Sequence, residues 1–366
     1  MSARRKVAAA VGVAVVAGAA VALSQYVPPN ERGRGAVAAG DLSGSLVGAG
    51  ASSQQAAMQG WTAGYSAVQP SVTVDYDPVG SGGGREQFIA GGIDFAGSDA
   101  PLDEEELVAA RGRCGGEVFE LPNYISPIAV VHNLPGVADL ALAPEVLAGV
   151  FARQITRWDD PAIAADNPGV ALPALPITPV NRSDDSGTTE NFTEYLAAAA
   201  PGAWPFEPDG EWPVGGGESA QGNSGVVAAV AGGAGTIGYA DLSQAGDLGV
   251  ARIGVGGEFV APTPEAAAAV VEGSEPLPGR GPYDFALELE RTTGASGSYP
   301  IVLVSYHLGC ITYEDEVTAD LVADFMTYVT SEEGQAAAAQ VAGSAPISDA
   351  LRQEARTAID AISTTS

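Results

Sequence analysis

Apolar residues recur at two different spacings along the chain, and the two spacings alternate. After a short apolar run at 45–50, Met58, Trp61 and Tyr65 recur at helical spacing. Residues 72–102 then read as a strand (VTVDYDPVG), a glycine-rich turn into a helical pattern, and a second strand and turn. This alternation of strands and helices predicts an α/β domain with a largely parallel sheet.

Two long apolar runs lie far apart in the chain. They are NYISPIAVVHNL at 123–134 and YPIVLVSYHL at 299–308, and we interpret them as a pair of crossover strands that join two lobes. Helical patterns at 145–155 and 191–200 lie between them, and the C-terminal residues 318–343 also have a helical pattern.

The N-terminal residues have the pattern of an export signal. A basic start, MSARRK, precedes the uncharged apolar run of residues 7–24. The run is either cleaved, for example after the small residues at 36–38, or kept as an N-terminal anchor, because its length is at the lower edge of a bilayer span. Residues 1–42 are therefore interpreted as a signal or anchor plus a linker. The remaining chain is expected outside the cytoplasmic membrane, in the periplasm or at the cell surface.

Charge narrows the classes of partner. The formal net charge of the 366-residue chain is −29, and Lys6 is its single lysine. Nucleic-acid binding depends on Lys and Arg contacts to phosphates, and docking on anionic lipid also depends on basic residues. We therefore expect neither nucleic acid nor an anionic membrane surface as a partner.

The cysteine count allows one intramolecular disulfide. Cys114 and Cys310 are the two cysteines of the chain. Export to an oxidising compartment favours a disulfide between them, and two buried free thiols are the alternative.

Several motifs of catalysis and cofactor binding are missing. The chain has no Walker-type phosphate loop, no G-x-S-x-G nucleophile elbow and no H-E-x-x-H zinc motif. His132 and His307 stand alone in apolar runs, which is typical of strand or core positions. The glycines at 80–84 do not fit a dinucleotide fingerprint. We expect no catalytic residue, no metal site and no cofactor.

Three small-residue turns stand where an apolar strand gives way to a helical pattern. They are GAGASSQQ at 48–55, VGSGGGREQ at 79–87 and RSDDSGTT at 182–189. Helix N-termini offer unpaired backbone N–H groups and a positive dipole end, so each turn is a candidate anion site. Ordinary helix capping explains any one of these turns equally well. Three of them in one chain, one of which opens on an arginine, favour a shared anionic ligand.

Asp99, in DFAGSDAPL, adds a criterion for the anion. An ionised carboxylate only accepts hydrogen bonds, so it repels an anion unless that anion has a proton to donate. Hydrogen phosphate has such a proton at neutral pH and sulfate does not, so an aspartate among donors selects phosphate. The alternative is that Asp99 only caps the helical pattern that follows it.

Together these motifs resemble a known family. GAGASSQQAAMQGW, GSGGGREQFIAGGIDFAGSDAPL, ITRWDDPAIAADNPGVALP, RSDDSGTTENFTEYL and GNSGVVAAVAGGAGTIGYADL resemble, in order, the extracytoplasmic phosphate-binding protein (PstS type) of the phosphate-specific ABC transporter. The resemblance implies an α/β, two-lobed periplasmic-binding-protein fold of type II with the ligand in a cleft. One lobe would comprise 43–124 and 303–366, and the other 125–302.

The resemblance also implies which residues contact phosphate. The positions that match the family's ligands are Ser52, Ser53, Ser81, Asp99, Arg182, Ser186, Gly187 and Thr188. Asp184 matches an aspartate that pairs with the arginine. The chain departs from the family in two places: the usual Thr-Phe-Pro is Ser-Ser-Gln at 52–54, and the lipid-anchoring cysteine of Gram-positive relatives is missing.

The resulting hypothesis is a non-enzymatic receptor that binds inorganic phosphate with high affinity. The resemblance implies a monomer that delivers phosphate to the permease subunits of an ABC importer with a cytoplasmic ATPase. The alternatives are a receptor for another tetrahedral oxyanion such as sulfate or molybdate, a secreted phosphatase, and a sensor that keeps the fold without transport.

Overall fold

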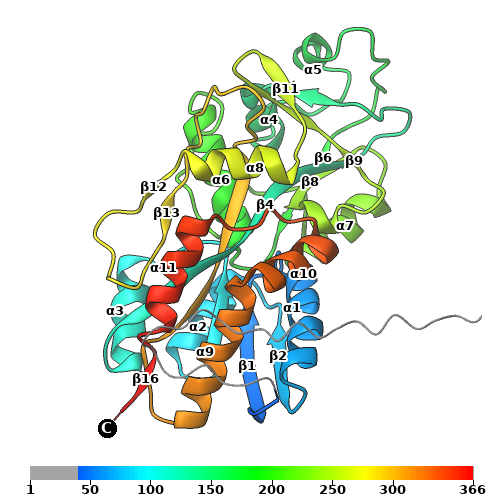
Figure 1. Ribbon diagram of the computed structural model, residues 1–366. Coiled ribbons are helices and arrows are strands. Elements are labelled where there is room, and N and C mark those ends of the chain that lie inside the picture. The colour runs from blue at the N-terminus through cyan, green and yellow to red at the C-terminus, as the bar shows by residue number, and fades with distance from the viewer. Residues whose placement is uncertain (1–39, 366) are drawn as a thin grey trace, which may run out of the picture. The chain divides into compact units, whose positions relative to one another are not determined.

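A mixed sheet of nine strands runs through residues 40–365, the part of the chain that the computed structural model describes (Figure 1). The strand order is β2-β1-β3-β14-β4-β8-β6-β7, and β9 pairs with β4 beside this path. The strands are β1 Gly44–Gly50, β2 Val72–Asp77, β3 Phe95–Ser98, β4 Val118–Asn133, β6 Thr178–Arg182, β7 Glu218–Ala220, β8 Thr236–Asp241, β9 Gly249–Val250 and β14 Val302–Cys310.

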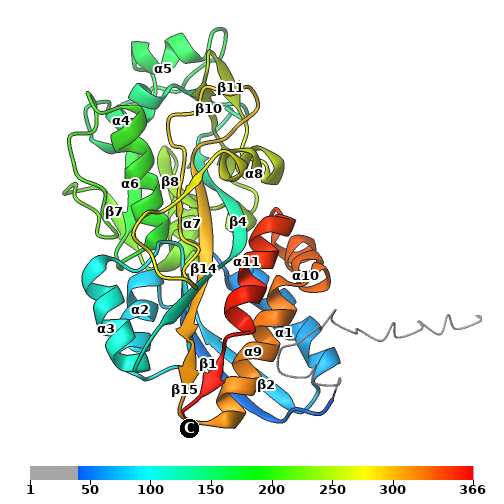
Figure 2. The same ribbon diagram turned by 60° about the vertical axis from the view of Figure 1, so that its left-hand side comes forward.

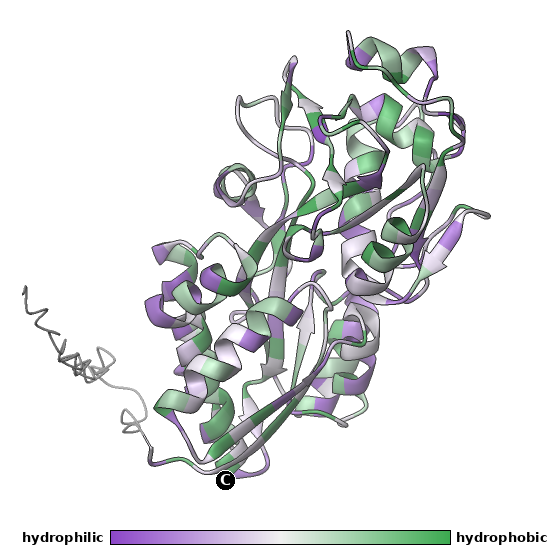
Figure 3. Cartoon of the chain, turned by 90° about the vertical axis from the view of Figure 1, so that its right-hand side faces the viewer, coloured by the Kyte–Doolittle hydropathy of each residue, from purple (hydrophilic) through white to green (hydrophobic). Residues whose placement is uncertain are grey.

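Helices surround both ends of this sheet (Figures 1 and 2). They are α1 Gln55–Val68, α2 Ser81–Ile89, α3 Glu104–Cys114, α4 Pro144–Phe151, α5 Pro161–Asp166, α6 Gly187–Ala199, α7 Gly222–Gly232, α8 Pro264–Glu272, α9 Glu316–Thr330, α10 Glu332–Ala342 and α11 Asp349–Ile359. Most helices carry both hydrophobic and hydrophilic positions (Figure 3), as expected for helices that cover a sheet on one side and face water on the other.

Strands β4 and β14 connect the two ends of the sheet. They pair antiparallel from Val302 opposite Pro127 to Cys310 opposite Val118, with a register shift between Ser305 and Tyr306. Beyond Pro127, β4 continues and pairs with β8 instead. Both strands are almost entirely buried, which explains their near-continuous apolar sequences. The prediction of two crossover strands from residues 123–134 and 299–308 is thereby confirmed.

The expectation of a largely parallel sheet is correct only at the two ends. Strands β2, β1 and β3 are parallel, and so are β7, β6 and β8, whereas β14 is antiparallel to β3 and β4, and β4 is antiparallel to β8. The reason is topological: the chain crosses between the ends in one direction along β4 and returns along β14.

The C-terminal region is more divided than its helical pattern predicts. Residues 318–343 fall into α9 and α10, and Ser331 separates them by accepting a hydrogen bond from the backbone N–H of Gly334 at 3.0 Å.

The hydrophobic pattern did not predict α11 or several short strands. These are β5 Ala141–Leu142, β10 Arg252–Val255, β11 Glu258–Val260, β12 Glu275–Pro276, β13 Leu287–Glu288, β15 Thr312–Tyr313 and β16 Ser363–Thr364.

A disulfide joins Cys114, at the end of α3, to Cys310, at the end of β14. His132 and His307 are buried in β4 and β14, as their apolar surroundings predict.

None of the helices in residues 40–365 is long and apolar enough to cross a membrane. The export signal or anchor proposed for residues 7–24, and most of the linker at 25–42, lie outside the described residues.

Candidate anion-binding site

The three glycine- and serine-rich turns meet at one place in the fold. Ser52 and Ser53 follow β1, Ser81 is the first residue of α2, and Arg182 ends β6 just before α6. The approach is close enough to require glycine: a Cβ added to Gly187 would lie 2.7 Å from the Ser81 hydroxyl oxygen and 2.8 Å from the Cβ of Asp99. The third turn of the sequence therefore packs directly against the second turn and against Asp99.

Asp99 lies at the centre of this cluster and is only 3% exposed. Three hydroxyls donate to its carboxylate: Ser53 Oγ at 2.5 Å, Ser305 Oγ at 2.6 Å and Thr188 Oγ1 at 3.0 Å. The helix that follows is capped by Asp103, which forms a capping box with Glu106. Asp99 is therefore not the cap of α3, and its carboxylate is directed into a cluster of donors.

The charge state of Asp99 reflects two opposing effects. Burial raises the pKa of its carboxyl above the usual value, while hydrogen bonds from Ser305, Ser53 and Thr188 and the positive charge of Arg182 oppose the rise. The net result is a raised pKa, since burial is the largest effect. The contacts act in the other direction and favour the ionised form, which can only accept hydrogen bonds.

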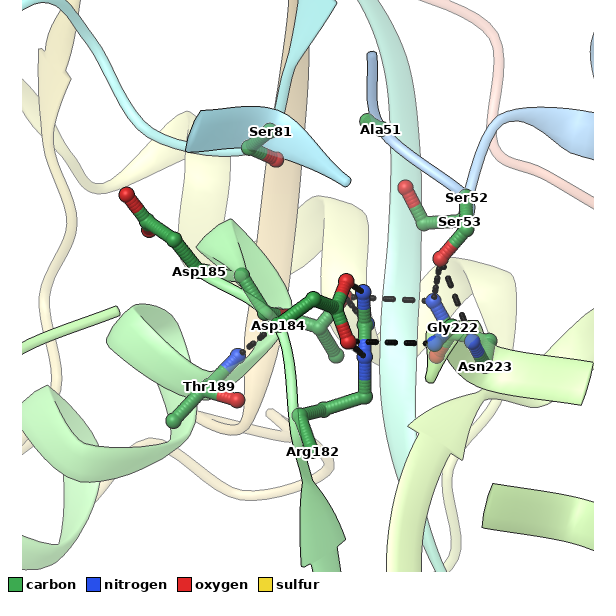
Figure 4. A network of polar contacts seen from close by, with 12 residues as sticks. Ala51, Ser52, Ser53, Ser81, Arg182, Asp184, Asp185, Thr189, Gly222 and Asn223 are labelled. Atoms are coloured by element: carbon green, nitrogen blue, oxygen red, sulfur yellow. Dashed lines mark hydrogen bonds and ion pairs between the residues drawn. The ribbon is translucent and has the colours of Figure 1, made fainter. Parts of the chain in front are cut away.

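Arg182 is held by a carboxylate of its own turn (Figure 4). Its side chain is almost fully buried, and Nε lies 2.8 Å from Asp184 Oδ1 while Nη2 contacts Oδ2. Asp184 also accepts the backbone N–H of Gly222 at 3.1 Å. Arg182 Nη1 donates to Thr188 Oγ1 at 3.5 Å. Asp184 thus fixes the plane of the guanidinium and partly neutralises its charge.

The first turn of α6 completes the cluster. Ser186 is its N-cap and accepts the backbone N–H of Thr189 at 3.1 Å, so the ordinary capping role applies to this hydroxyl. Gly187 and Thr188 are the first residues of the helix, where backbone N–H groups have no partner within the helix. The positive end of the helix dipole faces the same place.

These groups bring together what a protonated oxyanion needs: hydroxyls, the guanidinium of Arg182 paired with Asp184, helix N-termini, and the carboxylate of Asp99 as an acceptor. Among residues 40–365, no group of three or more His, Cys, Asp or Glu side chains is arranged to hold a metal ion. The arrangement is suited to binding by hydrogen bonds in a buried setting, where each bond is stronger than in water.

Comparison with known proteins gives the family. A profile of the PBP superfamily domain matches residues 35–333. Phosphate-binding protein PstS 3 of Mycobacterium tuberculosis is 37% identical over 324 residues, 87% of this chain and 86% of that protein. Phosphate-binding protein PstS of Xylella fastidiosa is 33% identical over 79% of this chain and 78% of its own. The chain belongs to the PstS family of phosphate-binding proteins.

Solved structures support the fold of this PstS-family chain. The high-affinity periplasmic phosphate-binding protein PfluDING, bound with phosphate, superposes with a TM-score of 0.69 at 24% identity, over 86% of this chain and 93% of that one. The phosphate-binding protein of Stenotrophomonas maltophilia gives a TM-score of 0.70 at 19% identity, over 86% and 94%. The fold is the α/β periplasmic-binding-protein fold, as the sequence motifs imply.

The structure also adds site residues that the PstS-type motifs did not single out. Asn223 contacts the Ser52 hydroxyl through its backbone N–H at 3.1 Å and its Nδ2 at 2.9 Å. Gln244 Nε2 donates to the Ser52 carbonyl at 2.8 Å. Ser305, from the middle of β14, donates to Asp99. Asn223 had a signal in the sequence, because GNSGVV is a fourth small-residue turn opening a helix, whereas Ser305 had none.

Proposed function

We propose that this PstS-family protein binds inorganic phosphate outside the cytoplasmic membrane and delivers it to an ABC-type importer. The environment of Asp99 supports this proposal most strongly. Its buried carboxylate accepts three hydrogen bonds from hydroxyls and lies next to an arginine and a helix N-terminus. Relatives such as phosphate-binding protein PstS 3 of Mycobacterium tuberculosis, which is 37% identical, are named for binding phosphate and support the same ligand.

The proposed phosphate ligands come from both ends of the sheet. Ser52, Ser53, Ser81 and Asp99 belong to the end with β1–β3, and Arg182, Ser186, Gly187 and Thr188 to the end with β6–β8. We propose that residues 43–124 with 303–366, and residues 125–302, act as two lobes that close over the ligand. The antiparallel pair β4 and β14 would be the hinge, since both lobe boundaries fall at these strands.

Binding in this proposal depends on local dipoles more than on net charge. The chain as a whole is strongly acidic and would repel a dianion, but salt screens charges beyond about 8–10 Å. Hydroxyl and backbone donors, with Arg182 partly neutralised by Asp184, would dominate at contact distance. Asp99 would accept a hydrogen bond from the O–H group of hydrogen phosphate. It would disfavour sulfate or molybdate, which carry no proton at neutral pH.

The partners and location follow from the same function. The protein would be exported by its N-terminal signal, or held at the membrane by the same segment as an anchor. It would act as a monomer and dock on the permease subunits of an importer that a cytoplasmic ATPase drives. No catalytic step is assigned.

Deletion of the gene in its native host tests this function. We expect phosphate uptake at low external phosphate to fall and to be restored by the wild-type gene. Unchanged uptake in the deletion strain would reject a transport role and favour a sensor. Purified protein should release no chromophore from a chromogenic phosphate ester, and steady hydrolysis would favour a phosphatase.

A further inference from the structure

Residues 273–300, which we call the strap, run from α8 to β14 and reach both ends of the sheet (Figures 1 and 2). Within the strap, β12 and β13 pair only with each other. The strap contains two arginines, Arg280 and Arg291. Arg291 is buried and Arg280 is partly buried, and both donate hydrogen bonds to acceptors on neighbouring elements.

Arg280 fixes the turn that carries Asp99. Its Nη1 donates to the backbone carbonyl of Leu102 at 2.7 Å, its Nε lies 2.7 Å from Asp284 Oδ2, and its Nη2 pairs with Glu120. Glu120 is fully buried on β4 and accepts the backbone N–H of Leu102 at 3.0 Å. Both backbone polar groups of Leu102, three residues after Asp99, are therefore held by one ion pair.

Arg291 reaches Asp99 through one intermediate residue. Its Nη1 donates to the Val302 carbonyl at 2.6 Å, and its Nη2 contacts Asn191 Oδ1 and, at 2.7 Å, Glu194 on α6. Asn191 Nδ2 then donates to the backbone carbonyl of Asp99 at 2.7 Å. Because a guanidinium only donates, Arg291 fixes the Asn191 amide with its oxygen toward the strap and its nitrogen toward Asp99.

A cavity of about 830 Å³ lies between the strap and the site. Its lining includes Asp99 and Asn191 of the site, Leu287 and Arg291 of the strap, and Tyr306 of β14. Close packing therefore does not hold the Asp99 turn on this side. The hydrogen bonds of Arg280 and of the Arg291–Asn191 pair hold the turn there instead. Asn191 also joins the turn to α6, the helix that begins with Gly187 and Thr188.

We propose that Arg280 and Arg291 are positioning residues that set the placement of the Asp99 carboxylate, and thereby the selectivity of the site for a protonated oxyanion over an unprotonated one. This inference rests on the proposed phosphate-binding function. Without the hydrogen bonds from Arg280 and Arg291, the Asp99 turn could move toward the cavity. The carboxylate would then accept a weaker hydrogen bond from hydrogen phosphate and would repel sulfate less strongly.

The test compares the dissociation constants of phosphate and sulfate, measured by calorimetry, with the melting temperature. Arg280→Lys and Arg291→Lys keep the buried charge but cannot reach all acceptors of the guanidinium fork. Asn191→Ala removes the link to Asp99 without changing any charge, and it remains informative if a lysine variant does not fold. Arg352→Lys is the matched control, because Arg352 is likewise ion-paired, to Asp349, and donates to the Thr330 carbonyl, but lies on α11.

We expect the phosphate-to-sulfate ratio of affinities to fall about tenfold in the strap variants and in Asn191→Ala, the effect of one lost charge-assisted hydrogen bond. The control should lower the melting temperature without changing the ratio. An unchanged ratio in strap variants that still bind phosphate would overturn the inference and leave the proposed function intact. Wild-type protein that does not bind phosphate would overturn the proposed function itself.

Discussion

The hydroxyl of Thr188 donates to Asp99 Oδ2 at 3.0 Å, although the two residues are 89 positions apart in the chain. Asp99 follows β3 and Thr188 opens α6, so this bond joins the two ends of the sheet across the candidate site. Arg182 donates to the same threonine oxygen. The carboxylate and the guanidinium are thus linked through one hydroxyl, which places an acceptor and strong donors around a common point.

Replacing Asp99 by asparagine should weaken the preference for phosphate over sulfate. The amide has an N–H group that can donate to sulfate, and it no longer accepts as strongly from a protonated oxyanion. We expect calorimetry to show the phosphate-to-sulfate ratio of affinities falling about 10- to 100-fold, which corresponds to about 1.5–3 kcal/mol for a hydrogen bond to a charged group. Asp324→Asn is the control, because Asp324 is also hydrogen-bonded, to Tyr65 and Gln69, but on α9. If Asp99→Asn and Asp324→Asn had the same phosphate-to-sulfate ratio of affinities, Asp99 would not be the residue that discriminates between the two anions.

Removing the guanidinium of Arg182 should weaken phosphate binding without unfolding the protein. Arg182 is 2% exposed and its main partner is Asp184 of the same turn, which keeps the Gly222 N–H as a partner after Arg182→Ala. We expect affinity to fall by about tenfold or more, as for other hydrogen bonds to charged groups. Arg157→Ala breaks an exposed pair with Asp159 and should leave affinity unchanged. Near-wild-type affinity of Arg182→Ala with a normal melting curve would show that Arg182 does not contact the ligand.

Sequence patterns could predict the parts of the site that are local. Ser52, Ser81 and Arg182 each stand in a strand–turn–helix pattern, and Asp99 stands out as a carboxylate in a small-residue turn. Ser305 could not be found in this way, because its orientation depends on the register shift in the pairing of β14 with β4. The contact of Asn223 with Ser52 spans 171 positions, and the antiparallel centre of the sheet likewise depends on long-range pairing that no local pattern contains.

Asp241 should make the protein less stable as the pH rises from about 4 to 6. Burial raises the pKa of its carboxyl from 3.8 to about 6, against opposing hydrogen bonds from Ser243 and other partners. Because the folded-state pKa is higher than the unfolded one, its contribution to stability is fully present below pH 4 and is lost as the pH passes 6. At about 1.4 kcal/mol per pKa unit, the loss is about 3 kcal/mol.

Chemical denaturation across this pH range, compared with Asp241→Asn, measures that contribution. The free energy of unfolding of the wild type should fall relative to the variant as the pH rises. Asp159→Asn provides a control without a slope in this range, because the hydrogen bond with Arg157 lowers the pKa of Asp159 from 3.8, and its contribution to stability therefore changes only below that pH. Parallel curves for wild type and Asp241→Asn would contradict the assignment.

The disulfide should stabilise the fold without affecting ligand affinity. It joins residues 196 positions apart and lies at the ends of α3 and β14. Replacing both cysteines by alanine should cost about 2–5 kcal/mol of unfolding free energy, as for other native disulfides. Reduction of the wild type should lower its melting temperature in the same way and leave the double variant unchanged. A parallel loss of phosphate affinity in the folded variant would show that the bond also shapes the site.

Selection of a protonated oxyanion by Asp99 can be measured in an equilibrium competition on the purified wild-type protein, with labelled phosphate displaced by phosphate, arsenate or sulfate at neutral pH. Hydrogen phosphate and hydrogen arsenate carry a proton for Asp99, and sulfate does not. We expect phosphate and arsenate to displace the label, whereas a large excess of sulfate should not. Displacement by sulfate at concentrations similar to those of phosphate would contradict the selection of a protonated oxyanion by Asp99.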